Sequence, residues 1–128
     1  MTAARYPVAV VIPTYNERDN LPVLIHKLFE FPDLAAIVVD DNSPDGTGAV
    51  ADRLGTQFPG RVTVLHRSAP DRGFGTAYLA GIATALTTGA ELIVQMDGDL
   101  SHDPAYLPAM RTAAGSADLG CSPRTRKM

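Results

Sequence analysis

Short apolar runs that alternate with longer helical patterns constrain the fold of this chain more than any other feature. The runs are rich in Val, Ile and Ala, as is typical of strands buried on both faces, and they cover 8–12, 35–39, 62–65 and 91–96. Helical patterns follow them at about 20–29, 47–58, 75–88 and 103–114. This alternation, with short links, predicts an α/β domain with a parallel sheet and helices on both faces.

Capping and turn-forming residues predict where these elements begin and end. Pro13 is expected to end the first strand, because proline cannot donate to a sheet ladder. Asp19 or Asn20 is expected to cap the first helix, and Thr47 the second. Gly89 is expected to close the third helix at its carboxyl end.

Composition limits the class of protein. The chain has 128 residues, of which 45% are hydrophobic and 20% charged, as in a single globular domain. A net charge of −3 argues against a nucleic-acid partner. The single cysteine, Cys121, excludes an internal disulfide and fits a reducing compartment. No apolar stretch approaches the roughly 20 residues of a membrane span, so we expect a cytoplasmic protein whose membrane contact is at most peripheral.

Charge is distributed unevenly along the chain. Arg124, Arg126 and Lys127 supply three of the 11 basic residues, which leaves residues 1–123 with a net charge of −6. We interpret the basic end as a solvated tail.

Polar clusters follow three of the predicted strands, at Pro13–Glu17, Asp40–Asn42 and Asp97–Asp99. Parallel strands joined by right-handed crossovers all end at the same edge of the sheet. Ligands of open α/β sheets bind at that edge. We therefore expect the three clusters to line one crevice.

Asp97 and Asp99 are two carboxylates one residue apart, directly after an apolar strand. Carboxylates in this arrangement can converge on one hard cation, and oxygen ligands suit Mg²⁺ or Mn²⁺. The alternative interpretation is two solvated loop acids. The preceding strand and the other clusters favour the metal site.

Side chains of the first two clusters can recognise a nucleotide. Glu17 and Asp41 can accept hydrogen bonds from ribose hydroxyls or base N–H groups, and Tyr15 can stack on a base or sugar. The alternative makes Glu17 an ordinary loop acid and Tyr15 a packing residue. Asp40 is predicted to tie down the neighbouring loop through backbone N–H groups, which leaves Asp41 for the ligand.

Glycine and histidine residues suggest two further features. Gly73-Phe74-Gly75, ahead of a helix, suggests an anion site at a helix N-terminus, although close loop packing explains the glycines equally well. His102 lies beside the two carboxylates in sequence, but a lone histidine is more often structural. His26 and His66 are assigned no role.

The motifs in combination resemble those of family-2 glycosyltransferases with the GT-A fold. The resemblance covers roughly residues 6–118 and is carried, in order, by Val11–Glu17, Val38–Thr47, Gly73–Tyr78 and Met96–Pro104. The last two segments are similar to those of polyprenol (dolichol) phosphate mannosyltransferases, whose usual metal motif is D-A-D-L-S-H-x-P. Gly98 stands where that motif has alanine, which leaves both carboxylates in place.

The resemblance implies a Rossmann-like GT-A domain that transfers mannose from GDP-mannose to a polyprenyl phosphate, with inversion, in glycolipid biosynthesis and protein glycosylation. It implies that Asp97 and Asp99 are catalytic and bind Mg²⁺ or Mn²⁺. The nucleotide sugar is expected at Pro13, Tyr15, Glu17, Val39, Asp41, Asp97, Gly98 and Asp99. UDP-glucose is the rival donor.

The sequence departs from the family after Asp118, where the family continues with a strand, a loop with glycine and arginine, and the acceptor side. The resemblance therefore implies a nucleotide-sugar-binding domain at residues 1–118 and a divergent basic tail at 119–128. Leu119–Met128 does not match that stretch, and Pro123 is unsuited to a central strand. A truncation or frame change near Leu119 explains both observations. The chain is then a donor half completed by a second chain, or a non-catalytic nucleotide-binding remnant, with an exposed sheet edge prone to aggregation.

One other enzyme class also has a strand followed by D-x-D. In haloacid-dehalogenase-type phosphatases the first Asp is the nucleophile, and here it would be Asp97. Those enzymes prefer Thr or Val after the second Asp, where this chain has Leu100. Their motif usually follows the first strand, whereas here it follows the fourth, so the transferase is the preferred hypothesis.

Overall fold

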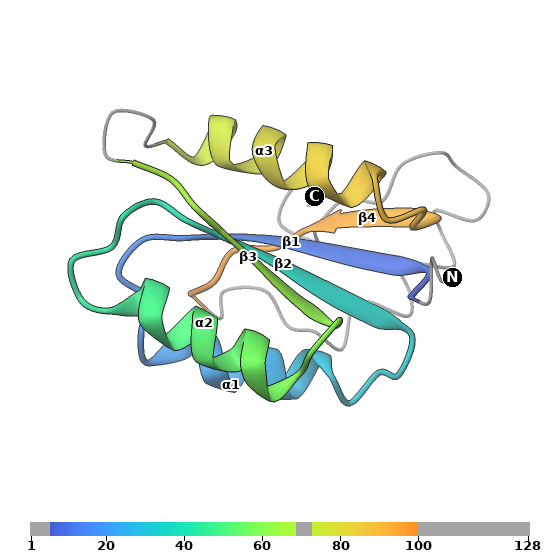
Figure 1. Ribbon diagram of the computed structural model, residues 1–128, viewed down its shortest axis with the longest axis horizontal. Helices are drawn as coiled ribbons and strands as arrows, with labels where there is room; N and C mark the ends of the chain where they lie inside the picture. Colours follow the sequence, from blue (N-terminus) through green and yellow to red (C-terminus); the bar gives the residue numbers. More distant parts are fainter. Residues whose placement is uncertain (1–5, 69–72, 100–128) are drawn as a thin grey trace, which may run out of the picture.

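The structure is a computed structural model that describes residues 6–68 and 73–99. Within this part of the chain, four parallel strands pair in the order β3-β2-β1-β4 (Figure 1). They are β1 (Val8–Thr14), β2 (Leu34–Asp40), β3 (Val62–His66) and β4 (Leu92–Gln95). The predicted parallel sheet is therefore confirmed.

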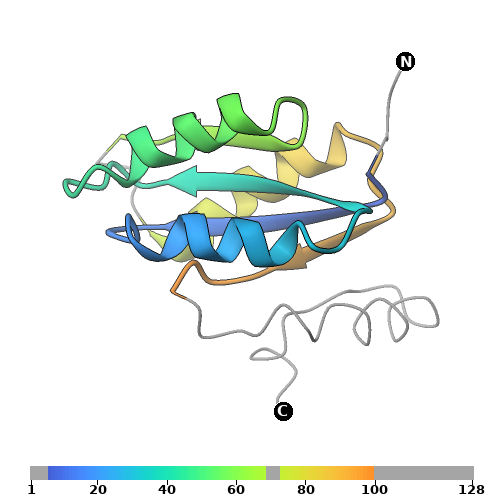
Figure 2. The same ribbon diagram turned by 90° about the horizontal axis from the view of Figure 1, so that it is seen from below.

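Helices of the described residues cover both faces of the sheet. They are α1 (Asn20–Leu28), α2 (Thr47–Gln57) and α3 (Phe74–Leu86). The first two lie on one face, and α3 lies on the other (Figure 2). Each helix begins and ends within two residues of its predicted bounds.

Neighbouring residues of β1 point into two separate cores. Val10 packs with Leu24 and Ile25 of α1 on one face, and all three are fully buried. Val11 packs with Ala77 of α3 on the other face. Because strand side chains alternate between faces, burial on both sides produces the uninterrupted apolar run seen in the sequence.

Small residues let α3 approach the sheet closely. A Cβ atom added to Gly81 would lie 2.3 Å from Cγ1 of Val11 and 3.2 Å from Cγ2 of Val39. Valine side chains are stiff at χ1 and cannot easily move aside. Gly75, earlier in the same helix, has no atom within 4 Å of that position. The close contact is therefore specific to Gly81.

The prediction that Pro13 ends β1 is wrong, because the strand continues to Thr14. The Val11 carbonyl accepts a hydrogen bond from Met96 on the β4 side, whereas the Thr14 carbonyl accepts one from Asp41 on the β2 side. The backbone N–H and C=O groups of successive β1 residues point alternately toward β4 and toward β2, so those of Pro13 point toward β4. The pairing of β1 with β4 has already ended at Val11. Proline is tolerated there because no ladder N–H is needed.

The predicted helix caps are also corrected. Gly46, with a left-handed φ of 95°, is the N-cap of α2, and Thr47 is its first helical residue. The backbone N–H of Thr47 donates to Oδ1 of Asp45 at 2.9 Å, so Asp45 binds the first backbone donor of the helix. Asp19 is the N-cap of α1, but its side chain makes no capping hydrogen bond.

Some predictions fall outside the described residues. These are the helix at 103–114, His102, Cys121 and the tail at 119–128. Among the helices that the structure describes, none is long and apolar enough to cross a membrane.

Candidate functional site

The carboxyl ends of the strands bring the three predicted clusters to one edge of the sheet. The Thr14 hydroxyl at the end of β1 donates to Oδ1 of Asp40 at the end of β2 (2.9 Å). The segment after β4 reaches the same place, since a Cβ atom on Gly98 would lie 3.5 Å from Cγ of Glu17. The predicted convergence on one edge is confirmed.

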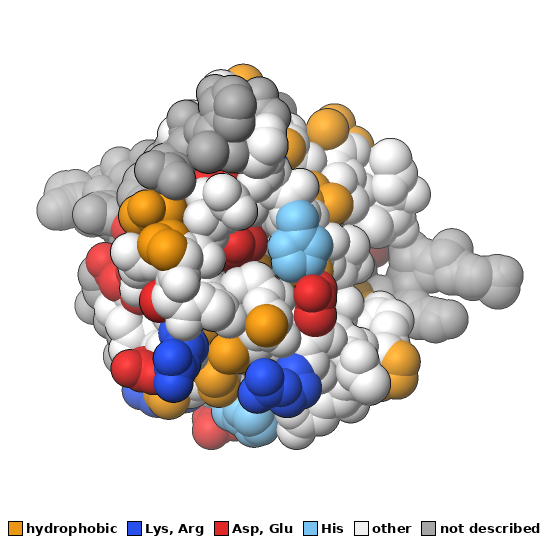
Figure 3. Space-filling model, turned by 60° about the vertical axis from the view of Figure 1, so that its left-hand side comes forward, with side chains coloured by type: hydrophobic (Ala, Val, Ile, Leu, Met, Phe, Trp, Pro, Cys, Tyr) orange, Lys and Arg blue, Asp and Glu red, His pale blue; other side chains and the backbone are white. Residues whose placement is uncertain are grey.

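Figure 3 views the molecule with this edge turned forward. Acidic side chains lie at several places on the face, and one is recessed between its neighbours. Basic side chains gather in the lower part of the view.

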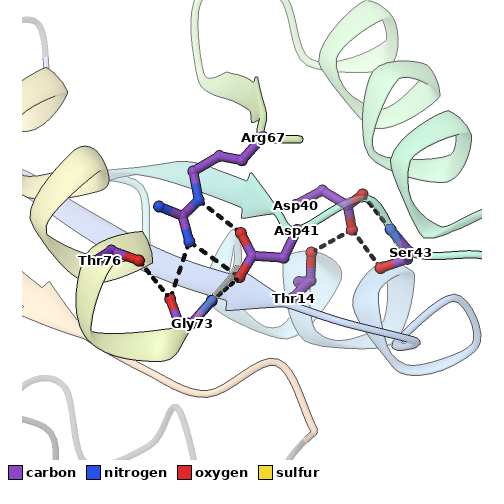
Figure 4. Close-up of polar contacts among 7 residues, drawn as sticks. All are labelled: Thr14, Asp40, Asp41, Ser43, Arg67, Gly73 and Thr76. Carbon is purple, nitrogen blue, oxygen red and sulfur yellow. Dashed lines mark hydrogen bonds and ion pairs between the residues drawn. The ribbon is translucent and has the colours of Figure 1, made fainter. Parts of the chain in front are cut away.

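Asp40 anchors the loop that follows β2. Its buried carboxylate accepts hydrogen bonds from the Thr14 hydroxyl, from the Ser43 backbone N–H (3.1 Å) and from the Ser43 hydroxyl (2.6 Å) (Figure 4). The predicted anchoring through backbone N–H groups is confirmed.

Asp41 points away from Asp40, toward the start of α3 (Figure 4). Its carboxylate accepts hydrogen bonds from Nε and Nη2 of Arg67 at 2.6 and 3.1 Å, and from the Gly73 backbone N–H at 2.9 Å. The side chains of Arg67 and Asp41 are 12% and 2% exposed, so the pair is bidentate and largely desolvated. The backbone N–H of Gly73 is therefore bound by an internal carboxylate, at the place where an external anion was considered.

The loop before α2 supports Glu17. The Glu17 backbone N–H donates to Oγ1 of Thr47 (3.0 Å), and Nδ2 of Asn20 donates to Oε1 of Glu17 (2.9 Å). Asp45 in turn accepts hydrogen bonds from the Thr47 hydroxyl and backbone N–H and from the Arg18 backbone N–H. Slight burial of Asp45 raises its pKa, but the hydrogen bonds that the carboxylate accepts lower the pKa by more. The pKa of Asp45 therefore lies below its usual value. Glu17 therefore stands on a loop that is fixed to the start of α2.

Asp97 and Asp99 follow β4 with one residue between them. Asp97 is 8% exposed, and its Oδ1 accepts a hydrogen bond from the Tyr78 hydroxyl (2.8 Å). Asp99 is exposed. Gly98 between them is closely packed, because a Cβ atom there would lie 3.1 Å from Cγ2 of Thr14. Within the described residues, no group of three acidic, histidine or cysteine side chains forms a complete metal site.

The remaining predicted residues lie on the strands or just beyond them. Pro13 and Val39 are register partners in β1 and β2, and both are buried. Tyr15 follows β1 and is partly exposed. All eight residues expected to contact a nucleotide sugar are thus at, or close to, the carboxyl edge of the sheet.

Two residues at this edge were missed by the sequence analysis. Arg67 directly follows β3, so it is a fourth polar group after a strand, and that position was a usable signal. Tyr78 is the last residue of the third family motif, Gly73–Tyr78, but that motif does not indicate a contact with Asp97, 19 residues away.

A family model identifies what kind of domain this edge belongs to. Residues 9–123 match the model of Glycosyl transferase family 2. The chain belongs to this family. The family resemblance inferred from the four motifs is therefore confirmed.

Two curated proteins are similar to this chain in sequence. The chain is 46% identical over 117 residues to a polyprenol monophosphomannose synthase of Mycolicibacterium smegmatis, covering 90% of this chain and 44% of that protein. It is 45% identical over 113 residues to an undecaprenyl-phosphate mannosyltransferase of Micrococcus luteus, covering 88% of this chain and 46% of that protein. The chain thus spans less than half the length of either relative.

Solved structures of similar fold include two further proteins. A mannosyltransferase, PcManGT of Pyrobaculum calidifontis in complex with GDP-Man and Mn²⁺, matches with a TM-score of 0.60 and 30% identity, over 74% of this chain and 28% of that one. TarS of S. aureus matches with a TM-score of 0.62 over 87% of this chain and 33% of that one, and at 20% identity it supports the fold alone. The predicted GT-A architecture is confirmed.

Proposed function

We propose that this chain binds GDP-mannose at the carboxyl edge of its sheet and serves the transfer of mannose to a polyprenyl phosphate, with inversion at the anomeric carbon. The observation that carries the proposal is the meeting of Asp97-Gly98-Asp99 with Glu17 at that edge. The names of the two relatives, 45% and 46% identical, supply the sugar and the class of acceptor.

The nucleotide is assigned to the side of the edge formed by β1 and β2. Pro13 and Val39 present backbone and apolar surface there, and Tyr15 supplies a ring for stacking. Glu17 and Asp41 accept hydrogen bonds from ribose or base. Asp41 is held by Arg67 and Gly73, so its carboxylate is fixed before a ligand arrives.

Asp97 and Asp99 are assigned to a divalent cation and to the diphosphate. Their chemistry fits Mg²⁺ or Mn²⁺, since two carboxylates plus substrate phosphates are a common ligand set for such ions. Asp97 and Asp99 would hold such a cation, which would supply charge neutralisation and orientation for the departing diphosphate.

The chain's own contribution to transfer is positioning and electrostatics. A phosphate oxygen of the acceptor bonds to C1 of mannose while the bond from C1 to the diphosphate breaks, and GDP leaves. The acceptor phosphate is already anionic, so the reaction needs no protein base. The role of the edge is therefore to hold the donor so that C1 of mannose faces the acceptor phosphate.

Transfer of labelled mannose from GDP-mannose into lipid tests the proposal directly. The chain is incubated with undecaprenyl phosphate and Mn²⁺, and we expect label in the lipid fraction. Replacing Asp99 with alanine should reduce the rate by at least about 100-fold, because stabilisation of the leaving diphosphate is lost. Glu30→Ala is the matched control, because it removes an exposed acid that follows the carboxyl end of α1, away from the strand ends that form the proposed site.

The outcomes separate the alternatives that remain. Binding of GDP-mannose without transfer favours a donor half that needs a second chain for the acceptor. Equal transfer from UDP-glucose contradicts the assignment of the donor. We also propose a cytoplasmic location with peripheral contact to the membrane, which cell fractionation tests.

A further inference from the structure

Tyr78 contacts Asp97 from a helix that lies on the opposite side of the sheet from α1 and α2. Its hydroxyl donates to Oδ1 of Asp97 at 2.8 Å. We propose that Tyr78 is a positioning residue, which fixes the Asp97 carboxylate for metal-dependent binding of the donor diphosphate. This inference rests on the proposed function, because it assigns Asp97 to the metal.

The Tyr78 ring is held independently of the site. It packs against the core beneath α3, whose members include Ala77 and Val39. The phenol is therefore anchored by its apolar body, and its polar tip reaches the carboxyl edge. Few rotamers remain open to a side chain held in this way, so the hydroxyl occupies a defined point.

The start of the same helix is bound to a second acidic residue of the proposed site, Asp41. The Gly73 backbone N–H at the N-cap of α3 donates to Asp41. One helix thus contacts Asp41 through its N-cap and Asp97 through its second turn. Packing of α3 on the sheet consequently sets the positions of both carboxylates.

The hydrogen bond has a predictable effect on a metal ligand. Asp97 is only 8% exposed, so water does little to fix its orientation. A donor on Oδ1 restricts rotation of the carboxylate about its last single bond. Partners of this kind behind a metal ligand typically contribute about 10–100-fold in metal affinity.

Replacement of Tyr78 with phenylalanine tests the proposal, because it removes the hydroxyl and keeps the ring in the core. The Mn²⁺ concentration that gives half-maximal binding of GDP-mannose is measured by calorimetric titration, and the affinity for GDP is measured in a metal chelator. We expect the half-maximal Mn²⁺ concentration to rise about tenfold or more, with the chelated GDP affinity unchanged. Tyr6→Phe is the matched control, since Tyr6 precedes β1 at the other end of the sheet.

Two results would overturn the positioning role alone. One is an unchanged Mn²⁺ requirement in a Tyr78→Phe chain. The other is an equal loss of affinity with and without Mn²⁺, accompanied by a lower melting temperature, which would make the tyrosine purely structural. If instead the parent chain binds GDP-mannose without any Mn²⁺ dependence, the metal assignment itself fails, and the positioning role fails with it.

Discussion

At the scale of the residue, two adjacent carboxylates serve different partners. Asp40 is the last residue of β2 and Asp41 directly follows it, and the extended backbone directs their side chains in opposite directions (Figure 4). Asp40 meets Thr14 and Ser43 on one side, and Asp41 meets Arg67 on the other. Two identical neighbouring residues therefore have different roles: Asp40 anchors the loop after β2, and Asp41 binds Arg67 after β3 and the backbone N–H of Gly73 before α3.

The sequence predicted the division between these two acids but not the partner of the second. Anchoring by Asp40 follows from local chemistry, since Ser43 is three residues away. The Arg67–Asp41 pair joins residues 26 apart, and their contact exists only because β3 pairs with β2. Sequence periodicity predicts the strands but does not give the order in which they pair.

Asp41→Ala is expected to destabilise the fold as well as the site. It removes the carboxylate from a largely desolvated ion pair with Arg67, and breaking a buried pair in this way typically costs about 3–5 kcal/mol in the free energy of unfolding. Adding Arg67→Met should recover most of that loss, because an apolar residue then fills the same space. Chemical denaturation of the parent chain, the single variant and the double variant measures both effects.

Asp19→Ala is the control for this comparison. Asp19 pairs with Arg18 at 3.9 Å, with side chains 97% and 60% exposed, so its loss should cost less than about 1 kcal/mol. A double variant no more stable than Asp41→Ala would contradict the account of the buried pair. In the double variant GDP binding should still be weakened by about 1–3 kcal/mol, and an unchanged GDP affinity would remove Asp41 from the nucleotide site.

At the scale of the element, the close approach of α3 to β1 connects the fold to the site. The alternating pattern predicted every described strand and helix to within two residues at each end. The roles of individual residues at the ends of these elements were less predictable, because neighbouring segments determine the roles of Pro13 and Thr47. A proline lies inside β1 where pairing with β4 has ceased, and Thr47 bonds to Glu17 rather than capping its own helix.

Gly81→Ala is expected to destabilise the protein although alanine favours helices. The added methyl would meet Val11 at 2.3 Å, and overpacking of this kind costs about 1–3 kcal/mol. Gly75→Ala in the same helix adds the same methyl to open space, so it should be neutral or stabilising by up to about 1 kcal/mol. Thermal unfolding of the two variants gives the comparison. Equal melting temperatures would show that the helix can move away from the sheet at no cost.

At the scale of the whole molecule, the described residues form the sheet edge on which a nucleotide sugar is proposed to bind. Topology made this edge predictable, since parallel strands place every strand-end cluster together. The family was predictable from four motifs, and the match over residues 9–123 confirms it. The roles of individual side chains at the edge stay predictions, because each role depends on where a ligand binds, and the sequence pattern does not give that position.

The most direct test of the central claim is calorimetric titration of the purified chain with GDP-mannose, with and without Mn²⁺, and with UDP-glucose as the control. We expect GDP-mannose to bind with an affinity that rises when Mn²⁺ is present, and UDP-glucose to bind far more weakly. This result would mean that the sheet edge of this 128-residue chain recognises the donor without any other protein. A folded chain that binds neither nucleotide sugar, or binds both equally and without regard to Mn²⁺, would contradict the proposed donor site.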